Sequence, residues 1–108
     1  MRIIMDRDAV CAGDDMNHHR EEFTVPDDIT IAGLFKFLEL KYTPVIYGNN
    51  VVWALYYHDR ELGAYFTKIQ SFINENILLS SIINKSEKDH EFYLHYYSHP
   101  DKYRKRFI

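Results

Sequence analysis

A cysteine and two adjacent histidines lie close together in the first quarter of the chain. Cys11 is followed by His18 and His19, and an imidazole near a thiol can hold it as a thiolate nucleophile. The carboxylates of Asp14 and Asp15 stand between them, and neighbouring negative charges raise the pKa of a thiol instead of lowering it. We therefore expect Cys11 to be a small, half-buried structural residue and the chain to have no catalytic residue.

Histidines near the C-terminus suggest a metal site only at first reading. His90 and His95 flank a segment that resembles a zinc-protease helix, but that motif needs its histidines four residues apart and these are five apart. His95 and His99 have the four-residue spacing, although Pro100 disfavours a continuous helix through them. We expect surface or tyrosine-paired histidines, no bound metal and no cofactor.

Paired carboxylates recur through the same N-terminal quarter of the sequence. Asp14-Asp15 and Glu21-Glu22 do not have the spacing of a calcium-binding loop. Asp27-Asp28 precedes a predicted helix, where negative charge near the first turn is favourable. Such pairs form either a solvated face or a face that binds a partner protein.

Aromatic residues are concentrated in the middle of the chain, at Trp53, Tyr56, Tyr57, Tyr65 and Phe66. Basic residues do not alternate with them, so they lack the phosphate anchors that base stacking normally requires. Most of these rings are expected in the core. Those on the outer side of a hairpin would serve as protein-binding anchors, because tyrosine and tryptophan give a large contact area at low entropic cost.

One helix is the clearest element that the sequence predicts. Thr30 is a suitable N-cap, and the apolar residues after it recur at three- and four-residue spacing up to Tyr42. The weaker apolar pattern over Ile69–Ile83 favours a second helical segment. Alternating or β-branched runs predict strands, namely Arg2–Met5, Arg20–Val25, Val45–Tyr47, Val51–Tyr57, Leu62–Thr67 and Glu91–Tyr97.

This order of elements predicts the fold. Two strands, a helix and then further strands is the order of a β-grasp domain, in which one helix packs across a mixed sheet. We expect residues 1–108 to form a single α+β domain of this kind. The chain ends in Arg106-Phe107-Ile108 and not in the Gly-Gly through which ubiquitin-like carriers are activated, so a carrier role is not expected.

Composition restricts the possible functions. The chain has 108 residues, 46% of them hydrophobic, with a formal net charge of −3 and one cysteine. An acidic domain of this size is expected to have one core and no general affinity for nucleic acid. No signal peptide or continuous apolar span is present in the sequence, so we expect a cytoplasmic protein that does not bind membranes.

A small acidic domain with exposed tyrosines and no catalytic motif resembles the immunity proteins that bacteria pair with polymorphic or contact-dependent toxins. The resemblance lies in the acidic segment Asp6–Asp28 and in the tyrosine-rich hairpin. It implies an inhibitor that covers the active site of one cognate toxin domain. Four carboxylates would face a basic cleft, in place of substrate phosphates if the toxin is a nuclease. The implied partner-binding residues are Asp14, Asp15, Glu21, Glu22, Tyr56 and Tyr57.

Two other classes of function stay open. The first is a regulatory domain that binds a metal or small ligand, either through Cys11, His18 and His19 or through His95 and His99. The second is a small enzyme with a carboxylate–histidine pair, which would need a pocket that brings distant residues together.

Overall fold

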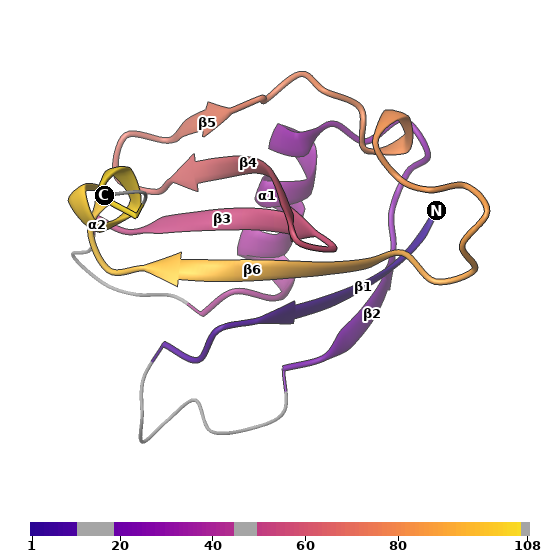
Figure 1. Cartoon of the computed structure of the whole chain (residues 1–108), viewed down its shortest axis with the longest axis horizontal. Coiled ribbons are helices and arrows are strands. Elements are labelled where there is room, and N and C mark those ends of the chain that lie inside the picture. The colour runs from indigo at the N-terminus through magenta and orange to yellow at the C-terminus, as the bar shows by residue number, and fades with distance from the viewer. Residues whose placement is uncertain (11–18, 45–49, 107–108) are drawn as a thin grey trace.

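In the described part of the chain, six strands form one mixed sheet with one long helix across one of its faces (Figure 1). The structure is a computed structural model, and it describes residues 1–10, 19–44 and 50–106. The elements are β1 (Arg2–Arg7), β2 (Glu21–Thr24), α1 (Ile31–Lys41), β3 (Val52–Tyr57), β4 (Arg60–Phe66), β5 (Ser71–Ile73), the 3-10 turn η1 (Leu79–Ser81), β6 (Glu91–Tyr97) and α2 (Pro100–Arg104).

The strand order is β2-β1-β6-β3-β4-β5. The two hairpins, β1–β2 and β3–β4, lie on either side of β6, which returns to the middle of the sheet. β6 runs parallel to β1 and antiparallel to β3. The first hairpin, the helix, the second hairpin and the central return strand follow the β-grasp order, so the predicted α+β fold is confirmed.

Helix α1 supplies one layer of the core. The hydroxyl of Thr30 accepts a hydrogen bond from the backbone N–H of Gly33 at 3.1 Å, which satisfies one of the free donors of the first turn. The predicted apolar face is buried at Ile31, Leu34 and Leu38, together with Phe35. It packs on the inner face of the sheet, which includes Ile3, Met5, Trp53, Leu55, Tyr65 and Leu94.

The prediction of a second helical segment over Ile69–Ile83 is wrong. The structure forms the short strand β5 there, then a loop and η1. Gln70 and Asn74 have φ values of 52° and 60°, in the left-handed region that a helix cannot include. β5 pairs with β4, so apolar residues that match a helical period are divided between an edge strand and a loop.

The loop after β5 completes the start of helix α1. The backbone N–H of Ile31 donates to the carbonyl of Ile77 at 2.9 Å, and that of Ala32 donates to the carbonyl of Glu75 at 3.0 Å. With Gly33 bonded to Thr30, each of these first-turn donors has an acceptor. The non-helical loop after β5 therefore stabilises helix α1, which the sequence did predict.

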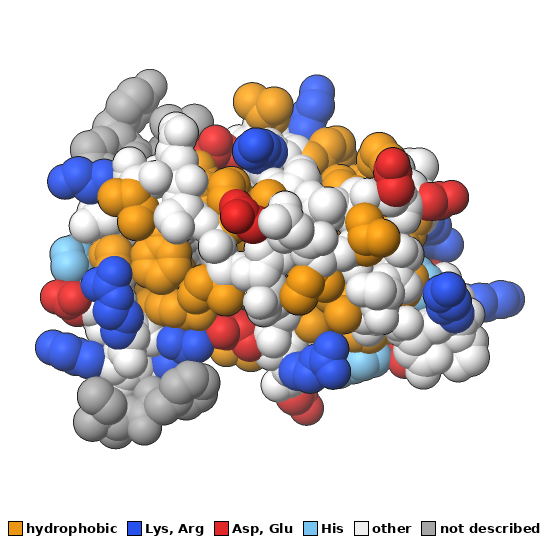
Figure 2. All heavy atoms as spheres, turned by 90° about the horizontal axis from the view of Figure 1, so that it is seen from above, with side chains coloured by type: hydrophobic (Ala, Val, Ile, Leu, Met, Phe, Trp, Pro, Cys, Tyr) orange, Lys and Arg blue, Asp and Glu red, His pale blue; other side chains and the backbone are white. Residues whose placement is uncertain are grey.

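Two further features complete the architecture. Helix α2 crosses one end of the sheet on the side opposite α1, where Tyr103 packs with Val52, Ala54, Ala64 and Phe66. From the β5 side of the molecule, apolar side chains lie scattered among charged ones (Figure 2). The predicted strand Val45–Tyr47 lies outside the described residues.

Candidate binding surface on the outer face of the sheet

The face of the sheet opposite α1, here called the outer face, is left open over much of its length. α2 covers only one end of it, and Figure 1 looks directly onto the remainder. Successive side chains of a strand point to opposite faces, so the outer face receives Tyr56 from β3 and Tyr93 and His95 from β6. These three side chains are half-buried, and they touch one another through ring contacts of 4.7 Å between centroids.

Asp8 connects the end of β1 to this aromatic group. Its Oδ1 accepts a hydrogen bond from the Tyr93 hydroxyl at 2.7 Å. Its Oδ2 accepts one from the backbone N–H of Tyr96 at 2.8 Å and lies 3.3 Å from Nδ1 of His95. Burial, and then the bond to Asp8, raise the pKa of Tyr93, which keeps the hydroxyl protonated as a donor.

Glu61 has the corresponding role on β4. Its carboxylate accepts hydrogen bonds from the hydroxyls of Tyr56 and Tyr103, at 3.3 and 3.0 Å, and pairs with the guanidinium of Arg106 at 2.9 Å. Burial is the main cause that raises the pKa of both tyrosines to about 12. One carboxylate therefore fixes Tyr56 on the open part of the face and Tyr103 on the side of α2 that packs on the sheet.

A third carboxylate, that of Glu87, ties the loop before β6 to the turn of the β3–β4 hairpin. It accepts from the Tyr57 hydroxyl at 3.2 Å, and its Oε1 lies 3.0 Å from Nε2 of His58. The Tyr57 hydroxyl also accepts from the backbone N–H of Asn84 at 3.1 Å. His58 is therefore fixed at one end of the open face.

Two adjoining hollows lie on the outer face. The first has a volume of about 340 Å³ and is lined by Tyr56, His58, Asp59, Tyr93 and His95. The second, of about 270 Å³, shares three of these residues and is completed by Asp6, Arg20, Glu91 and Phe92. Both are shallow and open to solvent, as is typical of a contact surface more than of an enclosed ligand site.

The partner-binding residues that the sequence predicts do not all lie on the outer face. Tyr56 is on the outer face, but Tyr57 is only 6% exposed and packs against Phe92 in the core, with the two rings tilted. Tyr57 is therefore not available to anchor a partner, because it follows Tyr56 in the strand and points to the opposite face. Asp14 and Asp15 lie outside the described residues.

Glu21 and Glu22 are both exposed on the edge strand β2, but they do not share a face. Phe23 packs on Phe37 of α1, so Glu21 lies on the helix side of the strand and Glu22 on the outer side. Glu22 pairs with the guanidinium of Arg2 at 2.6 Å. The acidic pair therefore contributes one carboxylate, and not two, to the outer face.

The residues considered for metal binding are separated. His95 belongs to β6 and pairs with Asp8, whereas His99 is the N-cap of α2 and accepts from the backbone N–H of Asp101. No group of three metal-binding side chains occurs in the described ranges. Cys11 and His18 lie outside those ranges, and the backbone carbonyl of His19 accepts a hydrogen bond from the Tyr42 hydroxyl.

Sequence reasoning did not identify Asp8, Glu61 or Tyr93 as members of this surface. Asp8 reaches its partners only because β1 and β6 lie side by side in a register that places Arg7 opposite Leu94. The one usable signal was the alternation of β6, which places Glu91, Tyr93 and His95 on one face. Which carboxylates meet them depends on the order of strands in the sheet.

Comparison with known proteins adds no relative to this description. No family model matches the chain, and no curated protein or solved structure is significantly similar to it. Within the described part of the chain, no helix is both long and apolar enough to cross a bilayer. The assignment of function therefore depends on the outer face alone.

Proposed function

We propose that this chain is a small binding protein of the bacterial cytoplasm, an immunity protein that neutralises a cognate toxin domain by covering its active site. The proposal is supported by the part of the outer face that α2 does not cover, where half-buried tyrosines lie among carboxylates. Aromatic anchors surrounded by polar groups are typical of surfaces that bind proteins.

The hydrogen bonds of these tyrosines favour rapid, rigid docking. Tyr93 is held by Asp8, directly after β1, and Tyr56 by Glu61 of β4, so their rings lose little conformational entropy when a partner covers them. Preorganised anchors of this kind bind more tightly than free ones because the cost of ordering them is already met.

The charges on the outer face support an inhibitor of a basic active site. Asp6, Glu91 and Glu22 are carried by three adjacent strands of the sheet, and the last two pair with the guanidinium groups of Arg20 and Arg2, which a basic cleft would compete with. Carboxylates grouped in this way accelerate encounter with a positively charged cleft and discriminate against acidic surfaces. The residues that we propose for contact are therefore Tyr56, Tyr93, Glu22, Asp6 and Glu91.

The test is inhibition of a purified partner. The tagged chain is used to capture a partner from the lysate of its native cells, and the captured protein is identified by mass spectrometry and produced separately. Its catalytic activity is then titrated with the wild-type chain and with Glu91→Lys. We expect inhibition at a one-to-one ratio by the wild type and weaker inhibition by the variant.

The matched control is Glu75→Lys, because Glu75 is exposed in the loop after β5, away from the outer face. It carries the same charge change and should inhibit as well as the wild type. A partner that is bound without loss of activity would contradict the immunity role. Equal effects of the two substitutions would contradict the assignment of the outer face.

A further inference from the structure

The tyrosine and histidine side chains around the two hollows are each hydrogen-bonded to a carboxylate. The hydroxyls of Tyr93 and Tyr56 donate to Asp8 and Glu61. His95 is bonded through Nδ1 to Asp8, and His58 through Nε2 to Glu87. A carboxylate only accepts hydrogen bonds, so each imidazole in its neutral form directs its N–H there and keeps an acceptor nitrogen.

The remaining lining is rich in acceptors. Asp59 borders the first hollow, and Asp6 and Glu91 border the second. Asp6 accepts the backbone N–H of Arg7 through Oδ1 at 2.8 Å, which leaves Oδ2 for another donor. Among the residues that the structure describes, three carboxylates and two tyrosines therefore line the hollows together with one arginine, Arg20, and no lysine.

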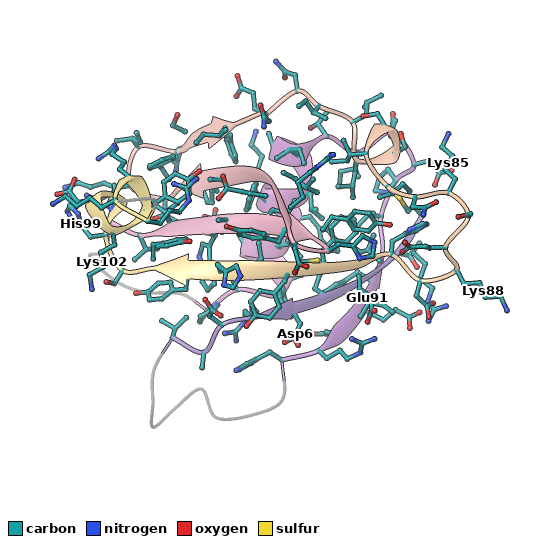
Figure 3. All side chains as sticks on the ribbon, viewed as in Figure 1. Asp6, Lys85, Lys88, Glu91, His99 and Lys102 are labelled. Carbon is teal, nitrogen blue, oxygen red and sulfur yellow. The ribbon has the colours of Figure 1, made fainter. Side chains whose placement is uncertain are left out.

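Arg20 indicates which chemical group suits this surface. Its guanidinium pairs with the carboxylate of Glu91 beside Tyr93. Figure 3 places Asp6 and Glu91 between the two ends of the sheet, whereas the labelled lysines Lys85, Lys88 and Lys102 lie toward those ends. A guanidinium matches a carboxylate in a forked geometry and stacks on aromatic faces.

We infer that the hollows between Tyr56 and Tyr93 receive a basic side chain of a protein partner, an arginine in preference to a lysine. This inference deepens the proposed function and rests on it, because it names the group by which the toxin domain is recognised. An anionic or donor-poor group would face three carboxylates, of which Arg20 neutralises one, Glu91. Arg20 of the chain and the incoming guanidinium then compete for the carboxylate of Glu91, and the incoming group displaces Arg20 from it.

The test uses the isolated chain, so it does not depend on finding the toxin. The probe is N-acetyl-arginine amide, titrated while the NMR signals of Tyr56, Tyr93 and His95 are followed. The control probe is N-acetyl-citrulline amide, which has nearly the same shape without the charge. We expect saturable shifts at these residues with the arginine probe and none with the citrulline probe.

Three variants test the geometry. Asp6→Asn is expected to weaken binding of the arginine probe about two- to fivefold, as for a partly exposed ion pair. Arg20→Gln is expected to strengthen it by a similar factor, because it frees the carboxylate of Glu91. Glu75→Gln, away from the hollows, should leave the affinity unchanged.

Several outcomes would overturn the inference. These are equal shifts with the two probes, shifts that do not saturate, or an Arg20→Gln variant that binds the probe more weakly. Putrescine provides a further arm, since tighter binding of this free diamine than of the arginine probe would assign the hollows to small amines instead of a protein side chain. If the chain inhibits a toxin but does not bind the arginine probe, this inference is refuted and the proposed function is not.

Discussion

The carboxylate of Asp8 lies against the imidazole of His95, with Oδ2 3.3 Å from Nδ1. Asp8 directly follows β1, and His95 is in the middle of β6, so the contact continues the parallel pairing of these strands beyond its last backbone partners. The same carboxylate accepts from the Tyr93 hydroxyl and the Tyr96 backbone N–H. Asp8 therefore joins two segments that are far apart in the sequence.

We predict that Asp8→Asn lowers the free energy of unfolding by about 1–2 kcal/mol, because the amide cannot accept all the hydrogen bonds that the carboxylate does. Urea denaturation measures this loss. Glu75→Gln is the control, since Glu75 is exposed and also loses one negative charge. If both substitutions have the same effect, then overall charge and not the Asp8 network is responsible.

Stability is predicted to fall in alkaline solution. The pKa of Tyr56, Tyr65 and Tyr103 is raised to about 12 by burial, whereas tyrosine in an unfolded chain has a pKa of about 10. The folded state therefore keeps protons that the unfolded state releases. This stabilisation is complete below pH 10 and is lost between about pH 10 and pH 12.

Urea unfolding at a series of alkaline pH values tests this prediction. The slope of unfolding free energy against pH should be smaller for Tyr103→Phe, which removes one of the shifted groups. An unchanged slope in this variant would mean that groups other than Tyr103 cause the alkaline loss. Absorbance of the tyrosinate form, followed in the folded protein, gives an independent measure of the same pKa values.

Two glycines should respond differently to alanine. A Cβ at Gly63 would lie 2.6 Å from the backbone carbonyl oxygen of Ile73 and 2.9 Å from a side-chain carbon of Ile31. Because β5 would have to move away from β4, we expect Gly63→Ala to cost about 1–3 kcal/mol of stability.

Gly33→Ala is the comparison for Gly63→Ala. Its Cβ would lie 3.2 Å from Ile29 and 3.3 Å from the Thr30 hydroxyl oxygen, a closeness that side chains can relieve by a small movement. Alanine also has a higher helix propensity than glycine by about 1 kcal/mol. Thermal unfolding should therefore show a clearly smaller loss at Gly33, and a larger loss there than at Gly63 would contradict the close approach of β5.

The sequence predicted those parts of the fold whose pattern is local. The strand Glu91–Tyr97 was expected with its observed bounds, because seven consecutive residues of this segment are mostly aromatic or apolar. Helix α1 was predicted from its cap and apolar spacing. The order of elements was then sufficient to predict a β-grasp-like sheet.

The remaining features depend on contacts that no local pattern contains. Ile69–Ile83 has a helical period, but its backbone satisfies the first turn of α1 and the edge of β4 instead. Likewise Tyr56 and Tyr57 are chemically equivalent in the sequence, and only the sheet decides that the second is buried. Asp8 becomes a neighbour of Tyr93 only through the order of strands in the sheet, and Glu61 a neighbour of Tyr56 through the register of the β3–β4 hairpin.

Asn74 offers a test of why this segment is not helical. Its backbone has a φ of 60°, and its side-chain amide donates to the carbonyl of Leu62 at 2.8 Å. Asn74→Gly removes the hydrogen bond but permits the left-handed backbone conformation, whereas Asn74→Ala removes the hydrogen bond and also disfavours that conformation. We expect Asn74→Ala to be the less stable variant by about 1 kcal/mol in chemical denaturation. The reverse order would indicate that the left-handed conformation contributes nothing here.

The two adjacent acids of β2 provide the last prediction, which tests the proposed docking face with the partner once it is purified. Glu22 is on the outer face and Glu21 on the opposite one, although both are exposed. At physiological salt, charges act over about 8 Å. Glu22→Lys should therefore slow association several-fold, and Glu21→Lys should do so much less.

Surface plasmon resonance measures both association rates, and far-UV circular dichroism checks that each variant is folded. Neither substitution should unfold the chain, because the pair between Glu22 and Arg2 is more than half exposed and such pairs contribute about 1 kcal/mol or less. Raising salt from low to physiological concentration should reduce the effect of both substitutions, and proportionally more that of Glu21→Lys, because screening weakens the more distant charge most. A larger effect at Glu21 would place the partner on the helix side of the sheet and contradict the outer face as the docking surface.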